Sequence, residues 1–458
     1  MTIAVIAEKP SVARDIARVI GARSRSGGTL RGNGYVVTWA IGHLVALAEP
    51  HEINPAWRRW SAAELPMLPR QWPLKVLPDT REQYDTVARV LNDDETEAVV
   101  CATDAGREGE LIFRYIVELA GCERPVQRLW ISSLTEAAIR AGFRALRHGH
   151  DLDALADAAR ARSRADWLVG MNLSRAYTLA LGETLSVGRV QTPTLAMVVE
   201  RDQAIARFEP EVYFEVEATF ARRGSADVGE DEPGFRGTFQ RPRQGEVGWD
   251  PRLSARLPAD GRWARAVVAR AGAGQAGVES VQRKQRRQPP PLLFDLTELQ
   301  RRANRLHGLS ADRTLKLAQQ LYERHKLISY PRTDSRHLSR DVAATLGPVV
   351  EALVQRHQGP ELAPDTGKRA LGRRFVDDAK VTDHHAIIPV GGAAAQPPTG
   401  DAGKIYDLIC RRLLCAWQAD HVTAVTTATA RVTTPCGEGP PAVDRYRASG
   451  TSVEQLGW

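Results

Sequence analysis

Three carboxylates early in the chain stand where they could share a cation. Asp104 and Glu108 belong to the stretch ATDAGREGE at 102–110, and Glu8 follows the apolar run TIAVIA. The glycines beside them allow the backbone to approach a ligand closely. Such a set suits Mg²⁺, which binds a few carboxylates, keeps several waters and usually also contacts phosphate. An acidic loop with a solvated rim is the alternative explanation of this stretch alone.

A second set of reactive side chains lies in LISYPRTD at 327–334. Pro331 holds the backbone of Tyr330 extended, and alternation along an extended chain sends Tyr330 and Arg332 to the same side. A tyrosine ionises near about pH 10, so it becomes a nucleophile only when a cation or a base stabilises the phenolate. Arg332 could do this while gripping a phosphate. A half-buried tyrosine at a turn with an exposed arginine also explains the fragment.

The elements around the acidic residues predict a parallel α/β sheet in residues 1–145. A strand followed by a loop and a helix occurs twice, with helices predicted over 10–21 and 109–121. In parallel α/β sheets the functional crevice lies at the carboxyl ends of the strands, where Glu8 and Asp104 both stand. We therefore expect these two carboxylates to converge.

The rest of the chain changes character several times. Helical periodicity fills 146–212, and short strands and loops are expected over 213–288. Helices return in 289–403, where Ser310 is a predicted N-cap. A loop rich in proline, glycine and alanine at 391–403 precedes a final helix and strands. With 458 residues the chain exceeds one ordinary core, so three or more domains are expected.

Charge and cysteine usage narrow the class of protein. The balance of 62 Lys and Arg against 55 Asp and Glu gives a net charge of +7, which favours an anionic partner. Basic clusters at 282–287 and 367–374 either contribute to such binding or form solvated loop surface. The five cysteines form no C-x-x-C pair, so a zinc ribbon or a disulfide framework is not indicated, and a reducing cytoplasm is expected. No apolar run approaches the length of a signal peptide core or a membrane span.

Eight motifs taken together resemble, in order, the type IA DNA topoisomerases, and within them the bacterial topoisomerase III branch. The resemblance runs from residue 1 to the end of the chain. The motifs are AEKPSVAR (7–14), IGHL (41–44), CATDAGREGELIFR (101–114), ADWLVGMNLSRAYT (165–178), SVGRVQTPTL (186–195), PPPLLFDLTELQ (289–300), YPRTD (330–334) and DHHAIIP (383–389).

The resemblance implies a multidomain toroidal core that combines α/β, α and β-rich domains. Its expected parts are a Toprim-like parallel α/β metal-binding domain (1–145), a helical DNA-binding domain (146–212), a helical domain with the catalytic tyrosine (289–403) and a β-rich arch (213–288 and 404–458). The final YRASGTSVEQLGW matches a point inside the family's core. An incomplete arch is therefore expected, in a chain that binds single-stranded DNA, cleaves it weakly at best and does not relax supercoiled plasmid.

The resemblance also implies a reaction. Tyr330 would attack a phosphodiester and form a 5′-phosphotyrosyl link, leaving a free 3′-hydroxyl. No ATP is needed, which agrees with the lack of a G-x-x-x-x-G-K-[ST] phosphate loop in the sequence. Lys9 matches the lysine that assists leaving-group protonation, and Glu8 matches an acid shared between the metal and proton transfer. Arg332 would clamp the phosphate, and His384 completes the catalytic set, although a lone histidine is more often structural.

The metal site departs from the family pattern. The acidic signature of the family is usually D-x-D-x-E, and Gly106 stands here in place of the middle acid. The implied cofactor is Mg²⁺, held by Glu8 and Asp104, with Glu108 binding it directly or supporting it. Restoring the acid with Gly106→Asp is expected to lower the Mg²⁺ concentration needed for activity, provided that the backbone does not require a positive φ.

The implied partner is single-stranded DNA, or single-stranded regions of underwound duplex, and no protein partner is indicated. Contacts to the DNA backbone give affinity rather than sequence preference. Trp60 could stack a base, although a buried packing role is the alternative. The residues assigned to DNA binding are Trp60, Arg162, Gly170, Ser186, Val187, Gly188, Arg189, Val190, Gln191 and Arg332.

Two other functions remain open at this stage. A Toprim-type metal-dependent nuclease or primase needs only the acidic residues, and a non-catalytic fragment that binds single-stranded DNA needs neither the acids nor Tyr330. A covalent protein–DNA adduct distinguishes the topoisomerase from both.

Overall fold

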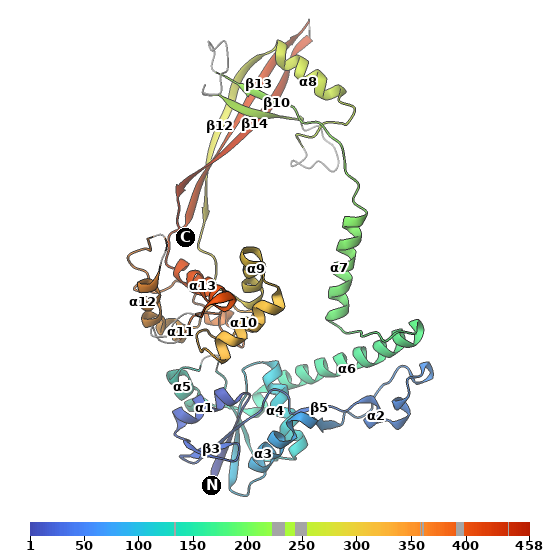
Figure 1. Ribbon diagram of the computed structural model, residues 1–458, viewed down its shortest axis with the longest axis vertical. Helices are drawn as coiled ribbons and strands as arrows, with labels where there is room; N and C mark the ends of the chain where they lie inside the picture. The colour runs from blue at the N-terminus through green and yellow to red at the C-terminus, as the bar shows by residue number, and fades with distance from the viewer. Residues whose placement is uncertain are drawn as a thin grey trace. The chain divides into compact units, whose positions relative to one another are not determined.

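The computed structural model describes residues 1–131, 134–221, 234–242, 254–357, 359, 361–390, 398–437 and 439–458. The chain divides into two compact units. The first unit comprises Met1–Asp202 and Leu292–Trp417, and the second comprises Gln203–Pro291 and Gln418–Trp458. Figure 1 shows the course of the chain through the α/β, helical and strand-rich parts.

A seven-stranded sheet forms the centre of the α/β part in the first unit. Its middle strands β4, β1, β7 and β8 run parallel, whereas β2, β3 and β9 pair antiparallel at the edges. The predicted parallel sheet is thus confirmed at its centre and is mixed at its edges. The strands, in sheet order, are β2 (Ser24–Ser26), β3 (Thr29–Gly32), β4 (Tyr35–Trp39), β1 (Thr2–Ala7), β7 (Thr96–Ala102), β8 (Val126–Arg128) and β9 (Arg147–His148).

Helices cover both faces of this sheet, which explains why β1 is apolar from Ile3 to Ala7. Val5 and Ala7 point toward the core shared with α1 (Pro10–Ile20) and α5 (Glu136–Arg144). Ala4 and Ile6 point toward the opposite core, shared with helices α3 (Arg81–Leu91) and α4 (Arg107–Ala120). The register pairs Ala7 of β1 with Ala102 of β7, so the two strands end side by side.

A buried ion pair fixes the loop that follows β7. Arg128 and Glu110 are 1% and 2% exposed, and their side chains pair at 3.1 Å. The Arg128 guanidinium also donates to the carbonyl oxygens of Cys101, Thr103 and Asp104. This one side chain therefore satisfies several backbone acceptors at the carboxyl end of β7, where water could not reach them.

The long helix α6 (Asp153–Leu181) leaves the sheet and packs on α4. A cluster of Trp57, Met67 and Trp167 anchors it to the segment between β5 (Val45–Leu47) and β6 (Leu74–Val76). Helix α7 (Gln191–Ala206) follows and is exposed on all sides. Shorter pieces are α2 (Pro50–Ile53) and the 3₁₀ turns Pro55–Arg58, Ala62–Glu64, Pro78–Thr80, Gly149–Leu152 and Asp378–Lys380.

The helical part of the first unit has its own core. Its helices are α9 (Leu296–His307), α10 (Ala311–Glu323), α11 (Arg340–Ala344), α12 (Leu346–Arg356) and α13 (Gly400–Cys415). The side chain of Ser310 caps α10 by accepting a hydrogen bond from the Arg313 amide at 3.1 Å. The expected boundary at residue 404 differs from the structure, because α13 buries Ile405, Ile409 and Leu413 in this helical core. The boundary lies after Trp417. Of the expected loop at 391–403, residues 391–397 lie outside the described part.

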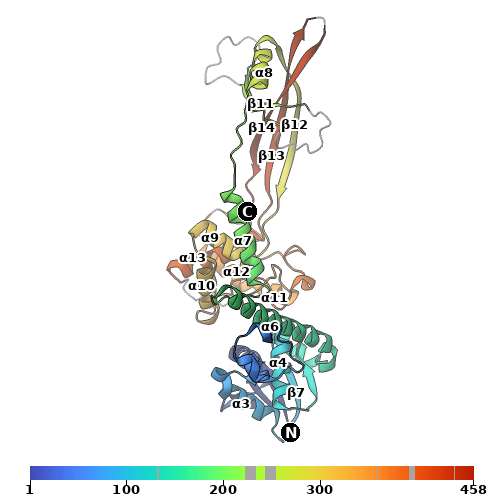
Figure 2. The ribbon, with the colours of Figure 1, turned by 90° about the vertical axis from the view of Figure 1, so that its right-hand side faces the viewer.

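The described residues of the second unit form a five-stranded antiparallel sheet, against which helix α8 packs. Helix α8 (Arg262–Ala273) places Val267 against Val432 and Tyr446. The basic cluster at 282–287 lies on an exposed edge strand rather than in a loop. Figure 2 shows the three long strands of the sheet side by side. In sheet order the strands are β10 (Glu217–Phe220), β11 (Phe235–Gln240), β14 (Gly439–Gln455), β13 (His421–Cys436) and β12 (Gln275–Gln288).

Among the described residues, no helix combines the length and the apolar character needed to cross a bilayer.

The buried pair of Arg128 and Glu110 yields a stability prediction. Arg128→Met should reduce the free energy of opening of the β1 and β7 amides by about 3–5 kcal/mol, because it leaves a buried carboxylate and several carbonyl groups without their donor. Native-state hydrogen exchange measures this change. The matched control is Arg140→Met, which removes an exposed pair with Glu136 and should cost less than about 1 kcal/mol. Equal losses in the two variants would contradict the assigned role.

Candidate active site

The ammonium group of Lys9 lies between two carboxylates at the carboxyl edge of the sheet. Its Nζ atom is 2.6 Å from Oδ2 of Asp104 and 3.3 Å from Oε1 of Glu8. Glu8 and Lys9 follow β1, and Asp104 follows β7, so the aligned ends of these parallel strands bring the three together. The backbone amide of Asp104 also donates to Oε2 of Glu8 at 3.1 Å.

These contacts shift the pKa values of Glu8, Lys9 and Asp104 away from their usual ranges. Burial acts to raise the pKa of Asp104, but hydrogen bonds and charges from His384 and Lys9 outweigh it and hold that pKa well below its usual range. Burial acts to lower the pKa of Lys9, but Asp104 and Glu8 raise it above its usual range. Burial raises the pKa of Glu8, and the charge of Asp104 adds to that effect. Lys9 is therefore a permanent cation beside a permanent carboxylate.

Tyr330 reaches this cluster from the helical part of the first unit. The Ser329 amide donates to the carbonyl oxygen of Ile388, and the Ser329 hydroxyl donates to that of Ala386. This pairing places the ring of Tyr330 with its centroid 4.4 Å from Nζ of Lys9. At this distance the ammonium is attracted by the negative face of the aromatic ring.

His384 joins the two parts of the site. Its Nε2 atom lies 3.2 Å from Oδ2 of Asp104, and its ring centroid lies 4.4 Å from that of Tyr330. Its carbonyl oxygen accepts a hydrogen bond from the Thr333 hydroxyl at 2.9 Å, which holds the loop beside the tyrosine. His384 is therefore a contact of both the predicted nucleophile and the predicted acid.

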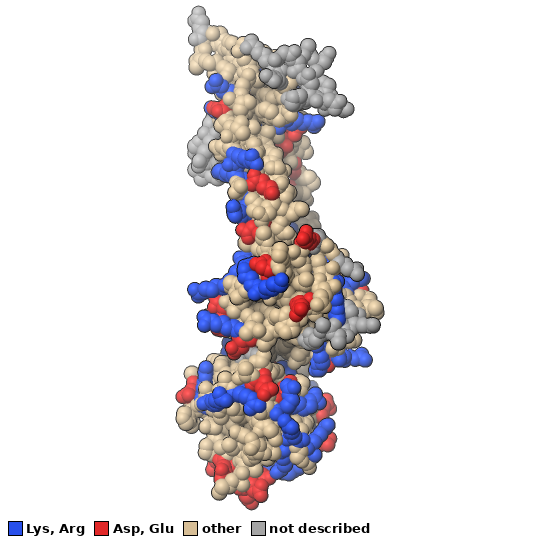
Figure 3. Space-filling model, turned by 90° about the vertical axis from the view of Figure 1, so that its left-hand side faces the viewer, with Lys and Arg blue, Asp and Glu red and all other residues tan. Residues whose placement is uncertain are grey.

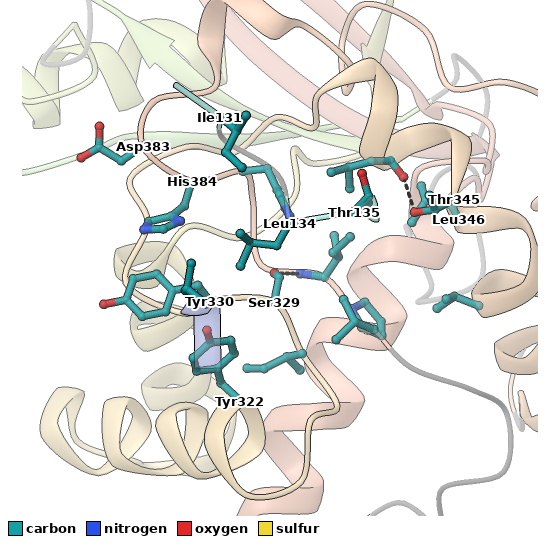
Figure 4. A pocket seen from close by; sticks show the side chains of 18 of the residues that line it. Ile131, Leu134, Thr135, Tyr322, Ser329, Tyr330, Thr345, Leu346, Asp383 and His384 are labelled. Carbon is teal, nitrogen blue, oxygen red and sulfur yellow. Dashed lines mark hydrogen bonds between the residues drawn. The ribbon is translucent and has the colours of Figure 1, made fainter. Parts of the chain in front are cut away.

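A cavity of about 640 Å³ opens beside these residues. Lys9, Asp104, Tyr330 and His384 line it together with apolar side chains such as Leu346. Figure 4 shows the rings of Tyr330 and His384 side by side at one end of the pocket, with Asp383 next in the chain. The cavity gives a reacting group access to the Tyr330 ring.

Arg332 lines an adjoining cavity of about 820 Å³ together with Gly106, Glu108 and Arg162. Burial alternates along this segment as expected, because Pro331 and Thr333 are buried whereas Tyr330 and Arg332 are more exposed, although Tyr330 and Arg332 line different cavities. The two cavities share Asp383 and His384. Among the described residues, the exposed guanidinium of Arg332 has no ion-pair partner, which leaves it available to an anion.

The side chain of Glu108 does not join Glu8 and Asp104, the other two predicted metal ligands. It lies in the first turn of α4, and its Oε1 atom is 2.6 Å from Nε2 of His43. The hydrogen bond from His43 lowers the pKa of Glu108, against the effect of burial, and it raises the pKa of His43. Within the described residues, no group of three or more His, Cys, Asp or Glu side chains has the arrangement of a metal site.

Most of the residues assigned to DNA binding gather along α6. The segment 186–191 is fastened to this helix, because the Ser174 hydroxyl accepts a hydrogen bond from the Val187 amide at 2.9 Å. Arg189 pairs with Asp166 at 2.7 Å. Gly170 lies under this segment, since a Cβ atom there would stand 3.7 Å from the carbonyl oxygen of Val187. Ser186, Gly188, Val190 and Gln191 are part of the same segment.

Trp60 lies in the same region and is 42% exposed, so it is not a buried packing residue. Its ring faces the Arg175 guanidinium at 5.2 Å. Together with Gly170 it lines a cavity of about 320 Å³. Figure 3 shows another face of the molecule, on which Lys and Arg side chains gather on the lower part with Asp and Glu side chains at their margin.

Four residues of the site were not singled out from the sequence. His43 belongs to the motif IGHL and Asp383 to the motif DHHAIIP. These motifs could have identified both residues from the sequence. Tyr322 packs edge-on against Tyr330 with ring centroids 5.3 Å apart, and Arg128 supports the Asp104 loop. No local pattern marks either of these, because their partners are distant in the sequence or are backbone atoms.

Comparisons with known proteins agree with this geometry. A family model described as DNA topoisomerase matches residues 151–458, and a Toprim domain model matches residues 3–134. DNA topoisomerase 3 of Shouchella clausii is 42% identical over 460 residues, covering 99% of this chain and 59% of that protein. DNA topoisomerase 3 of Bacillus subtilis is 38% identical over 458 residues, with 99% and 59% covered.

Among solved structures, full-length topoisomerase I from Thermotoga maritima matches with a TM-score of 0.59 and 21% identity, covering 98% of this chain and 65% of that chain. At this identity the match supports the fold alone. The chain spans about 59% of the length of the curated relatives named above. Because the topoisomerase model matches more than half of the chain and a Toprim domain precedes that match, the chain belongs to the type IA DNA topoisomerases, and the curated relatives that it resembles are named DNA topoisomerase 3.

Proposed function

We propose that this chain cleaves and rejoins one strand of DNA through a covalent link between Tyr330 and a 5′-phosphate. The observation that carries the proposal is the position of Lys9, which contacts the ring of Tyr330 and forms a 2.6 Å ion pair with Asp104. A nucleophile, a permanent cation and a carboxylate thus meet at one cavity, as transesterification of a phosphodiester requires.

The proposed reaction exchanges one phosphodiester for another. The phenolic oxygen of Tyr330 attacks the phosphorus, the bond from phosphorus to the 3′-oxygen breaks, and the tyrosine loses its proton. The departing 3′-oxygen takes up a proton, and we propose Lys9 as its donor because the Lys9 ammonium lies 4.4 Å from the centroid of the Tyr330 ring. The number of phosphodiester bonds is unchanged, so the reverse attack by the 3′-hydroxyl rejoins the strand without ATP.

Mg²⁺ is the proposed cofactor, because a Toprim domain model matches residues 3–134 and the carboxylates of Glu8 and Asp104 meet at the edge of the sheet in that domain. Glu8 and Asp104 already hold one cation between them, the ammonium of Lys9, so their oxygens face a common point. A hard cation bound by one or two carboxylates and a substrate phosphate is the usual magnesium arrangement. When bound, the ion would neutralise charge on the phosphate. Glu108, which is paired with His43, would take part only after leaving that partner.

Single-stranded DNA, or a single-stranded region of underwound duplex, is the proposed substrate. Trp60 offers an exposed ring for stacking, and Arg162 and Arg332 line one cavity next to the catalytic cluster. The segment 186–191 offers backbone and polar groups along α6. These groups contact phosphate and base faces rather than base edges, so we expect little sequence preference from them.

A metal-dependent nuclease or primase is less well supported. Either activity would use the acidic residues and would leave the placement of Tyr330 against Lys9 and His384 without a purpose. A protein that only binds DNA would have no use for the cluster that Lys9, Asp104, Tyr330 and His384 form. The contact of Tyr330 with the cluster therefore favours strand transfer to the tyrosine.

Tyr330→Phe should abolish the covalent adduct with a single-stranded oligonucleotide and leave the binding affinity for that oligonucleotide nearly unchanged, because only the nucleophilic oxygen is lost. Denaturing electrophoresis measures the adduct, and fluorescence anisotropy measures binding. Tyr35→Phe, in the sheet and away from the site, is the matched control. Adduct formation by the Tyr330 variant would refute the assignment of the nucleophile.

Lys9→Met should slow adduct formation by about 10²–10³-fold, because it removes the charge that stabilises the phenolate and the departing oxygen. Lys316→Met removes a largely exposed lysine paired with Asp312 and should leave the rate unchanged. Single-turnover rates at saturating oligonucleotide measure both effects. A Lys9 variant that is folded and reacts at the normal rate would show that Lys9 is structural.

A further inference from the structure

The sheet of the second unit has one covered face and one exposed face. Helix α8 packs against Val432 of β13 and Tyr446 of β14, which are 2% and 0% exposed. Side chains alternate between the two faces along a strand, so Arg431 and Arg445 point away from α8. These two arginines are register partners, and both are exposed. We call the face of the sheet opposite α8 the outer face.

The strand register shows which other side chains lie on the outer face. Steps of two along β13 from Arg431, followed by crossing to β12, lead to Lys284 and Arg286. The outer face continues with Arg447 on β14 and with Arg236 on β11. It therefore has six basic side chains, all of them exposed, which are Arg236, Lys284, Arg286, Arg431, Arg445 and Arg447.

Acidic side chains offset only a small part of this charge. Among the residues of the five strands, the acids on the outer face are Glu217 and Glu279. Glu279 accepts hydrogen bonds from the Arg445 guanidinium at 2.8 and 2.9 Å. Glu217 lies on β10, the edge strand farthest from β12. In the part of the chain that the structure describes, the other five basic side chains of this face have no ion-pair partner.

Hydroxyl groups lie between the basic side chains of the outer face. Thr427 and Thr429 of β13 and Ser449 and Thr451 of β14 belong to this face by the same alternation. The Phe and Tyr side chains of the five strands instead pack in the core beneath α8. Arg, Lys, Ser and Thr side chains commonly contact the phosphate oxygens of DNA. The chemistry of the outer face therefore matches a phosphate backbone.

The lack of aromatic rings on the outer face indicates which form of DNA it suits. Single strands are bound largely by stacking their bases on aromatic side chains, which this face does not offer. A duplex keeps its bases inside and presents one negative charge per about 1.7 Å of its axis. Between the positions of Arg286 and Arg431 the sheet extends by roughly 27 Å along β13, the length of about eight base pairs.

We infer that the outer face binds the phosphate backbone of duplex DNA. The second unit then holds intact duplex, whereas the groups proposed for single strands, such as Trp60 and Arg332, belong to the first unit. Because the contacts are to phosphate, this binding depends on salt and not on base sequence. The inference does not depend on the proposed strand cleavage, since Tyr330 takes no part in it.

The test is fluorescence anisotropy of the whole chain with a blunt-ended duplex of about 20 base pairs, at several salt concentrations and in a Tyr330→Phe background. Lys284→Gln/Arg286→Gln and Arg431→Gln/Arg447→Gln each remove two charges from the outer face. Each double variant should raise the Kd by about tenfold and reduce the slope of log K against log salt by about 2. Thermal unfolding checks that each variant is folded.

The matched control is Arg283→Gln/Arg287→Gln, which removes two charges from the opposite face of the same strand. Salt screens charges over about 10 Å, so the control should change the duplex Kd by less than about twofold. A single-stranded oligonucleotide of the same length should bind every variant with a Kd within about twofold of the unsubstituted value, because its stacking groups lie in the first unit.

Three results would overturn the inference. The first is a whole chain that does not bind the duplex, and the second is a duplex Kd that the outer-face variants change no more than the control does. The third is an equal loss of affinity for duplex and single strands, which would assign the outer face to single-stranded DNA. Adduct formation by the chain with Tyr330 is measured separately, so failure of the proposed strand cleavage leaves the duplex result intact.

Discussion

The position of one ammonium group, that of Lys9 between Glu8 and Asp104, is the constraint on which the rest of the site depends. Two carboxylates at the partly buried end of a sheet repel each other and lose hydration, so they stay ionised only with a cation between them. The parallel register of β1 and β7 places the pair, and Arg128 holds the carbonyl of Asp104 from behind. The same ammonium then contacts Tyr330, which couples the sheet to the helical part.

The convergence of Glu8 and Asp104 could be predicted from the sequence, because strand ends of a parallel sheet meet at one edge. The continuous apolar runs were sufficient to predict β1 and β7, and helical periodicity with helix end signals was sufficient to predict α1 and α4. The approach of Tyr330 to Lys9 could not be derived in this way, since more than three hundred residues separate them along the chain. It entered the sequence analysis only through the ordered motifs of the family.

Features that depend on the direction of a side chain could not be predicted from the sequence. Glu108 stands in the expected motif, yet it turns to His43 in the loop after β4, a choice that spacing does not encode. The sequence predicts α13 as an amphipathic helix that precedes a strand. Its contacts in the structure show that it belongs to the helical core and not to the strand-rich unit. The sequence has glycine at position 106, where the family usually has an acid. In the structure, the carboxylate of Asp383 occupies the space that a side chain at 106 would enter.

The central claim is that Tyr330 becomes joined to the 5′-phosphate of a cleaved strand. The most direct test is to trap the adduct on single-stranded oligonucleotides labelled at the 5′ or the 3′ end, digest it with protease and sequence the modified peptide by mass spectrometry. We predict that the 3′-labelled fragment stays with the protein and that the phosphate is on Tyr330. A phosphate on another residue, or retention of the 5′-labelled fragment, would contradict this account.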